Sequence, residues 1–132
     1  MLSNEDITLV SNLIDLEFYR FKRYKVPATV TIFESKCGDV FETITDKMRK
    51  TDICQYIDDS RFVILLSHTE AHEANQAIAK FLTYLNKECL SSIFVGYTEI
   101  NGMDMSSRSV VKRANAALVS ALKTQNKNVI QV

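Results

Sequence analysis

Glycine, proline and tryptophan are scarce in this chain. Its 132 residues include three glycines, one proline and no tryptophan, where average usage would give about nine glycines and about six prolines. Neither Gly-x-Gly-x-x-Gly nor Gly-x-x-x-x-Gly-Lys occurs. Both of these phosphate-binding loops depend on glycine to bring backbone N–H groups close to a nucleotide. The sequence therefore excludes the two common glycine-rich nucleotide cradles.

The sequence also lacks an excess of either charge and any long apolar run. Its 16 Lys and Arg residues balance 16 Asp and Glu residues, whereas nucleic-acid-binding domains usually show a clear basic excess. No apolar run approaches the roughly 20 residues that a membrane span needs. The opening Met-Leu-Ser-Asn-Glu-Asp has neither the basic nor the apolar region of a signal peptide. With 46% apolar residues, the chain is expected to fold as one compact domain.

Three cysteines, Cys37, Cys54 and Cys89, are widely spaced and form no Cys-x-x-Cys pair. An odd number with this spacing argues against a disulfide framework and against a zinc site. Reduced cysteines are typical of the cytoplasm, so we expect a cytoplasmic location. Cys54 lies among strand-forming residues and is expected to be a small buried apolar side chain.

Helical periodicity of the apolar residues predicts the helices. It occurs in four segments, which are residues 4–24, 40–49, 70–88 and 108–124. Residues that favour the N-cap position stand before the first three of these segments. These predicted caps are Ser3, Asp39 and Thr69.

Segments rich in β-branched and aromatic residues predict the strands. These segments are residues 28–34, 53–57, 61–67 and 92–99, with a short edge strand at 129–130. The run Phe62-Val63-Ile64-Leu65-Leu66 is continuously apolar, which indicates an interior strand covered on both faces. Because one hairpin occurs among longer crossovers, we expect an α/β (α+β) sandwich: a central mixed sheet of about five strands with helices on both faces.

Two small polar clusters contain residue types that can bind metal ions. His68 and His72 stand four residues apart near glutamates, but no third ligand is evident, so surface or capping roles are favoured. Asp58 and Asp59 occupy the gap between two predicted strands. Because aspartate readily adopts turn conformations, we interpret this pair as a hairpin turn rather than as magnesium ligands.

The segment Arg49-Lys50-Thr51-Asp52 combines two groups that can recognise guanine. An arginine can donate two hydrogen bonds to the O6 and N7 atoms of guanine, and a carboxylate can accept from its N1–H and N2–H groups. An Arg-x-x-Asp also arises often by chance in a chain of this length. The alternative interpretation is an arginine at a helix C-terminus, next to an aspartate in a turn.

Taken in order, several segments resemble the GGDEF domain of the diguanylate cyclase family. In that family an Arg-x-x-Asp inhibitory site lies five residues before the Gly-Gly-Asp-Glu-Phe hairpin, and this chain keeps that register between Asp52 and Asp58. Further segments that resemble family motifs are Arg23-Tyr24 with Pro27, Phe94-Val95-Gly96-Tyr97-Thr98, Arg113-Ala114-Asn115-Ala116-Ala117-Leu118 and Lys127-Asn128-Val129. The resemblance implies one GGDEF-like, nucleotide-cyclase-like domain over residues 1–132, whose first helix, 4–24, would connect to any preceding domain.

The resemblance also implies a degenerate domain without cyclase activity. The signature Gly-Gly-Asp-Glu-Phe is replaced by Asp58-Asp59-Ser60-Arg61-Phe62, in which only the core phenylalanine remains. Ser60 and Arg61 thus stand where the family has a metal-binding acid. The family loop after the first predicted strand, which holds phosphates and guanine, is shortened to Ser35-Lys36-Cys37-Gly38-Asp39. Glu34 aligns with the first metal-binding aspartate and is at most a remnant of that site. We therefore expect no catalytic residue, metal site or cofactor.

Three functional hypotheses follow. The first is a catalytically inactive regulatory or protein-interaction module in bacterial cyclic di-GMP signalling, which contacts another signalling protein or domain or forms a homodimer. The second is a cyclic di-GMP receptor that uses Arg49, Asp52 and Lys80. Lys80 stands where the family often has a second arginine, and it offers a point charge but no bidentate contact. The third is an unrelated α/β enzyme. None of the three involves nucleic acid or a membrane.

Overall fold

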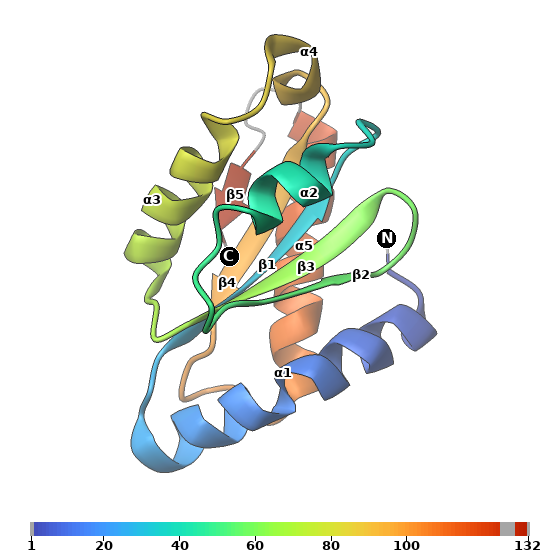
Figure 1. The fold of residues 1–132 in the computed structure, drawn as a ribbon. Coiled ribbons are helices and arrows are strands. Elements are labelled where there is room, and N and C mark those ends of the chain that lie inside the picture. The colour runs from blue at the N-terminus through green and yellow to red at the C-terminus, as the bar shows by residue number, and fades with distance from the viewer. Residues whose placement is uncertain (1, 125–128, 132) are drawn as a thin grey trace.

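The computed structural model of the protein describes residues 2–124 and 129–131. Five helices and five strands occur in these residues (Figure 1). In chain order they are α1 (Asn4–Tyr24), β1 (Ala28–Glu34), α2 (Val40–Thr45), β2 (Ile53–Tyr56), β3 (Arg61–Ser67), α3 (Ala71–Leu82), α4 (Lys87–Leu90), β4 (Phe94–Glu99), α5 (Ser107–Thr124) and β5 (Val129–Gln131). None of the described helices is both long enough and apolar enough to cross a membrane.

The central strand of the sheet is β1. The strand order is β2-β3-β1-β4-β5, and β1 pairs antiparallel with both β3 and β4. The hairpin of β2 and β3 is antiparallel, whereas β5 runs parallel to β4. The predicted mixed sheet is therefore confirmed, as is the interior position of the apolar strand β3.

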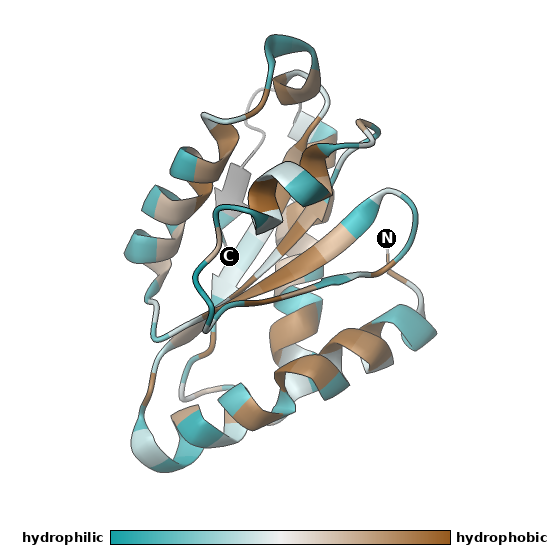
Figure 2. Cartoon of the chain, viewed as in Figure 1, coloured by the Kyte–Doolittle hydropathy of each residue, from teal (hydrophilic) through white to brown (hydrophobic). Residues whose placement is uncertain are grey.

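Helices cover both faces of the sheet, so that alternate residues of β1 and β3 enter different cores. Val30 of β1 and Leu65 of β3 pack with α1 and α5 on one face. Phe33 of β1 and Ile64 of β3 pack with α2 and α3 on the other face. Much of β3 and the inner sides of the helices are accordingly strongly apolar (Figure 2). The predicted sandwich with helices on both faces is confirmed.

The first helix follows its local sequence signals closely. The Ser3 side chain accepts a hydrogen bond from the Asp6 backbone N–H, and the Asp6 side chain accepts one from the Ser3 N–H, which forms a capping box. At the other end Lys25 adopts the left-handed conformation with φ 59° and ends the helix. Proline at position 27 follows two residues later, where helices commonly stop.

The predicted helix over 40–49 is shorter in the structure. It ends at Thr45, and Asp39 makes no side-chain hydrogen bond to its first turn. The backbone N–H of Lys47 bonds to the Ile44 carbonyl, and that of Met48 bonds to the Thr45 carbonyl. These tighter turns replace the last helical turn and lead into β2.

The predicted helix over 70–88 divides into α3 and α4. The N-cap of α3 is Glu70 rather than Thr69, and Glu73 completes its capping box. The chain then turns, and α4 begins where the Asn86 side chain accepts a hydrogen bond from the Cys89 N–H at 2.9 Å. Apolar spacing alone continues through this segment, but the Asn86 cap starts a new helix.

The expectation that the cysteines form no disulfide is wrong. Cys37, between β1 and α2, and Cys89 of α4 form a disulfide bond, with their Cα atoms 5.7 Å apart. Their separation of 52 residues carries no local signal for this pairing. Cys54 is free, and burial raises its pKa to about 12. Because disulfides persist mainly in oxidising surroundings, the cysteines no longer argue for a reducing compartment.

Gly96 of β4 lies directly against the backbone of α5. A Cβ atom at this position would overlap the backbone of Leu118 and would stand 2.7 Å from the Ala114 carbonyl oxygen. These contacts are with backbone atoms of α5, which cannot move aside by side-chain rotation. Glycine is therefore required here for close packing between strand and helix, not for an unusual backbone conformation.

We predict that Gly96→Ala destabilises the protein by about 1–3 kcal/mol, because the added methyl group overpacks the contact between β4 and α5. Urea unfolding followed by circular dichroism measures the change. The matched control is Gly102→Ala, since a Cβ at Gly102 meets nothing within 4 Å, and its effect should stay within about 0.5 kcal/mol. Equal stability of the two variants would contradict the packing argument.

Candidate functional site

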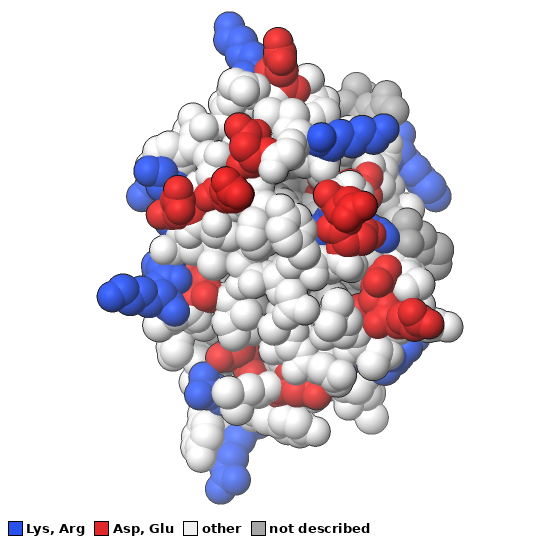
Figure 3. Space-filling model, turned by 45° about the vertical axis from the view of Figure 1, so that its right-hand side comes forward, with Lys and Arg blue, Asp and Glu red and all other residues white. Residues whose placement is uncertain are grey.

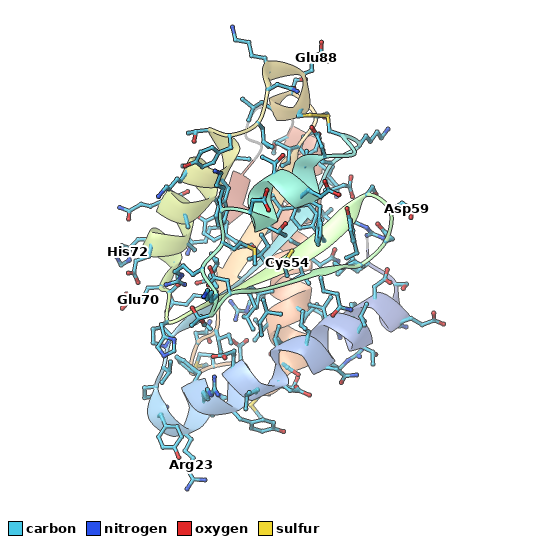
Figure 4. The ribbon with its side chains drawn as sticks, in the orientation of Figure 1. Arg23, Cys54, Asp59, Glu70, His72 and Glu88 are labelled. Carbon is cyan, nitrogen blue, oxygen red and sulfur yellow. A yellow bond between two sulfur atoms is a disulfide. The ribbon has the colours of Figure 1, made fainter. Side chains whose placement is uncertain are left out.

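The turn of the β2–β3 hairpin is closed by Asp58. Its Oδ1 atom accepts hydrogen bonds from the backbone N–H groups of Ser60 at 3.1 Å and of Arg61 at 2.9 Å. Asp59 is exposed beside it at the tip of the hairpin (Figure 4). Aspartate commonly binds the backbone two or three residues ahead in this way. The turn predicted from the two aspartates is thus confirmed.

Arg61 joins the hairpin to its surroundings through ion pairs. Its side chain is only 13% exposed; Nε donates to Asp58 Oδ2 at 2.9 Å, and Nη2 lies 3.6 Å from Asp6 Oδ2 in α1. The hydrogen bond to Asp58 raises the pKa of Arg61. Burial alone would raise the pKa of Asp58, but hydrogen bonds from Arg61 and Ser60 outweigh it and hold this pKa below its ordinary value. Both groups are therefore charged and paired at neutral pH.

Glu34, the possible remnant of a metal site, faces this arginine. It is the cross-strand partner of Arg61 in the antiparallel register of β1 and β3, and its charge also favours the protonated guanidinium. Magnesium requires several oxygen ligands around it. Within residues 2–124 and 129–131, no group of three or more His, Cys, Asp or Glu residues could hold a metal ion. The residues at this hairpin do not fit a magnesium site.

Aromatic rings fill the space between α2 and the hairpin. Phe41 of α2 stacks on Tyr56 of β2 with ring centroids 3.9 Å apart, and it meets Phe62 of β3 edge-on at 5.2 Å. Phe33 of β1 stacks on Phe62 at 4.9 Å. A cavity of only about 40 Å³ remains beside these rings. Ligand pockets usually measure roughly 300–1,000 Å³, so this cavity is too small for a nucleotide. A separate, open hollow of about 380 Å³ lies against Tyr56, Asp58 and Asp59 and is bordered by two carboxylates.

A larger groove of about 240 Å³ lies between the α2–β2 connection and α3. Its walls combine cations, carboxylates and an apolar floor. The lining residues are Lys47, Arg49, Asp52, Leu66, Thr69, Glu73, Ala77, Lys80 and Phe81. The structure therefore brings Arg49, Asp52 and Lys80, the three residues predicted to bind ligand, to one groove. The sequence contained no signal for the participation of Lys47, in the α2–β2 connection, or of Glu73, in α3.

Within this groove Arg49 bonds to its own chain. Its Nη2 atom donates to Asp52 Oδ1 at 2.8 Å, to the Ser67 carbonyl at 2.7 Å and to Thr69 Oγ1 at 2.9 Å. Asp52 Oδ2 accepts from the Arg49 backbone N–H and from Nε. The hydrogen bond to Asp52 raises the pKa of Arg49. The pair therefore ties the α2–β2 connection to the end of β3.

The two partners of this pair differ in exposure. The Asp52 side chain is 2% exposed and both of its oxygens are engaged, whereas the Arg49 side chain is 54% exposed. Among the described residues, Nη1 of Arg49 has no hydrogen-bond partner. Asp52 is thus a structural acceptor, and Arg49 keeps donors open toward solvent.

The histidines lie on the surface, as predicted. His68 occupies the turn after β3 with a positive φ of 54°, and His72 lies in the first turn of α3, near Glu70 at its outer edge (Figure 4). The distance from His72 Nδ1 to Glu70 Oε2 is 3.8 Å. Acidic and basic side chains intermingle over the face shown in Figure 3, where the described residues form no continuous basic patch.

We predict that Asp52→Ala lowers the free energy of unfolding by about 1.5–3 kcal/mol, because it removes a buried charged acceptor of three N–H groups. The matched control is Asp46→Ala, which alters an exposed aspartate at the end of α2 and should change stability by less than about 0.5 kcal/mol. Urea unfolding compares the two variants. If both unfold at the same urea concentration, Asp52 does not hold this segment in place.

No protein-family model matches this sequence, and no curated protein does. Solved structures match it over nearly its whole length. The GGDEF domain of DgcB from Caulobacter crescentus, in complex with c-di-GMP, has a TM-score of 0.76 at 11% identity, over 94% of this chain and 88% of that chain. The FimX GGDEF domain from Pseudomonas aeruginosa has a TM-score of 0.78 at 13% identity, over 95% and 92%.

A further match is the diguanylate cyclase SiaD from Pseudomonas aeruginosa, in complex with its activator SiaC. It has a TM-score of 0.79 at 17% identity and covers 95% of this chain but 57% of the SiaD chain. At such low identities the likeness concerns the arrangement of the elements and not the chemistry of the site. The chain therefore has the fold of GGDEF domains, which its ordered motifs predict.

Proposed function

We propose that residues 1–132 form a catalytically inactive GGDEF-fold domain that regulates another bacterial signalling protein by direct contact, within cyclic di-GMP signalling. In this proposal the domain uses no cofactor and converts no substrate. The observation that carries it is the position of Arg61. Its partly buried guanidinium is bonded to Asp58 and stands across the strands from Glu34.

Arg61 opposes catalysis for an electrostatic reason. Enzymes that transfer phosphoryl groups use metal ions to neutralise the charge that develops on phosphate and leaving group. Here the positive charge belongs to a side chain that Asp58 and Asp6 already neutralise. Beside the hairpin, Phe41 and Tyr56 stack and leave a cavity of only about 40 Å³. Both features support a domain that does not turn over GTP.

The structural neighbours support a signalling role. SiaD is described in complex with its activator SiaC, and DgcB in complex with c-di-GMP. Proteins with this fold therefore take part in protein–protein regulation and in recognition of the dinucleotide. An α/β enzyme of unrelated fold is no longer a useful hypothesis, because the chain has the GGDEF fold.

We predict that the purified chain forms no cyclic di-GMP when it is incubated with GTP and magnesium, because the hairpin lacks a metal site. Chromatography of the nucleotides measures the product. The active GGEEF domain of a diguanylate cyclase from Vibrio cholerae serves as the positive control. Formation of cyclic di-GMP above the no-protein level would contradict the proposed inactivity.

A second candidate function is recognition of cyclic di-GMP by the groove beside α3, which at about 240 Å³ can hold a guanine or phosphate part of the ligand but not the whole dinucleotide. The observation that favours it is the meeting of Arg49, Lys80 and Lys47 on one groove. Because Asp52 is buried and already bonded to Arg49, we expect the cations rather than this carboxylate to contact the ligand. The open Nη1 atom of Arg49 and the two lysines would meet phosphate or guanine oxygen atoms.

We predict that calorimetric titration with cyclic di-GMP gives binding that Lys80→Ala weakens by about fivefold or more, because a groove cation is lost. The matched control is Lys87→Ala in α4, outside the groove, which should leave the affinity unchanged. No heat at high micromolar ligand would reject this second function without affecting the first. An equal loss in both variants would show nonspecific attraction by charge.

A further inference from the structure

The outward face of α1 carries a stripe of exposed apolar side chains. Leu9, Leu16 and Tyr19 are 38%, 61% and 66% exposed. Together with exposed Asn12 they follow one another at steps of three, four and three residues, the spacing of a coiled-coil seam. Ile14 and its buried neighbours face the opposite way, into the core. In Figure 1, α1 is the outermost element at the bottom of the view, below the sheet.

Charged residues continue this stripe at its two ends. Glu5 lies four residues before Leu9, and Arg23 lies four residues after Tyr19. Both are exposed, and neither forms an ion pair with any residue that the structure describes. Arg23 points away from the body of the protein (Figure 4). The stripe is thus acidic at one end, apolar in the middle and basic at the other end.

We propose that this stripe binds α1 of a second copy of the chain in antiparallel orientation. Leu9 and Tyr19 lie five residues on either side of Ile14, and Glu5 and Arg23 lie nine residues on either side of it. A two-fold axis near Ile14 therefore places Leu9 against Tyr19 of the second copy. It also places Glu5 against Arg23 of the second copy, and each contact occurs twice.

Charge selects this orientation over the parallel one. A parallel pair would set Glu5 against Glu5 and Arg23 against Arg23, and like charges across an interface repel. The same charges also suit the dipole of α1 within a single copy, with acidic residues in its first turn and basic residues in its last turn. In the antiparallel pair they additionally attract across the interface.

The surface beside the stripe adds apolar area. Lys22 Nζ donates to the Gly102 carbonyl at 3.2 Å, which holds the loop before α5 beside the C-terminal part of α1. In this loop Met103 and Met105 are 88% and 91% exposed. Methionine adapts its shape to irregular neighbours. A single helix pair buries less than the roughly 1,600 Å² of a standard interface, so we expect weak, concentration-dependent dimers. This inference depends on neither of the two functions proposed above.

Sedimentation equilibrium from low to high micromolar protein tests the interface. The wild type should dimerise, and Leu16→Glu should weaken the dimer by about tenfold or more, because a charge would be buried without a partner. The matched control is Tyr84→Glu, which changes a residue 45% exposed outside α1 and should leave association unchanged. Circular dichroism verifies that each variant is folded. A wild type that stays monomeric, or a dimer that survives Leu16→Glu, would overturn the proposal.

Charge exchange tests the orientation. Glu5→Arg alone and Arg23→Glu alone should each weaken the dimer, since each creates like-charged neighbours in the antiparallel pair. The double variant, with both changes, should restore wild-type association. A parallel pair would leave all four proteins alike, because like residues already face each other in it. That outcome would overturn the antiparallel arrangement.

Discussion

The backbone of α5 lies against the backbone of β4 at Gly96, and one whole side of the sheet depends on this contact. The strand β4 is paired with the central strand β1, so its distance from α5 sets the thickness of that layer. The same helix supports α1, for example where Ser107 Oγ donates to Asp15 Oδ1 at 2.6 Å. A side chain larger than hydrogen at Gly96 would push both helices away from the core.

Paired charges and aromatic rings hold the segments around β2 and β3. Asp58 and Arg61 close the hairpin, and Arg49 and Asp52 close the connection from α2 to β2. In each pair the two residues stand three apart and bond across a turn. The charges of these pairs are neutralised within the chain, so the hairpin has few free charged groups that could take part in a reaction. This neutralisation of charges within the chain agrees with both the proposed loss of catalysis and the proposed role in contacts with other proteins.

Local signals explain which elements could be predicted. The bounds of α1 agree with the Ser3 capping box and the apolar period, and those of β1 and β3 agree with their β-branched and aromatic runs. The division of α3 from α4 was missed, because it depends on one side-chain cap from Asn86. The grouping of Arg49, Asp52 and Lys80 was predicted only through the family resemblance, since nothing in their spacing brings Lys80 to the other two.

The sequence by itself determined most of the elements, the mixed sheet around one hairpin and the altered signature Asp58-Asp59-Ser60-Arg61-Phe62. These features are encoded in periodicity, caps and turn residues, which act over a few positions. Only the tertiary structure decided that Cys37 bonds to Cys89, that Arg61 faces Glu34, and that Asp52 is buried against its own arginine. Such partners meet because the helices and strands pack in layers. The separation of two residues along the chain does not predict whether this packing brings them together.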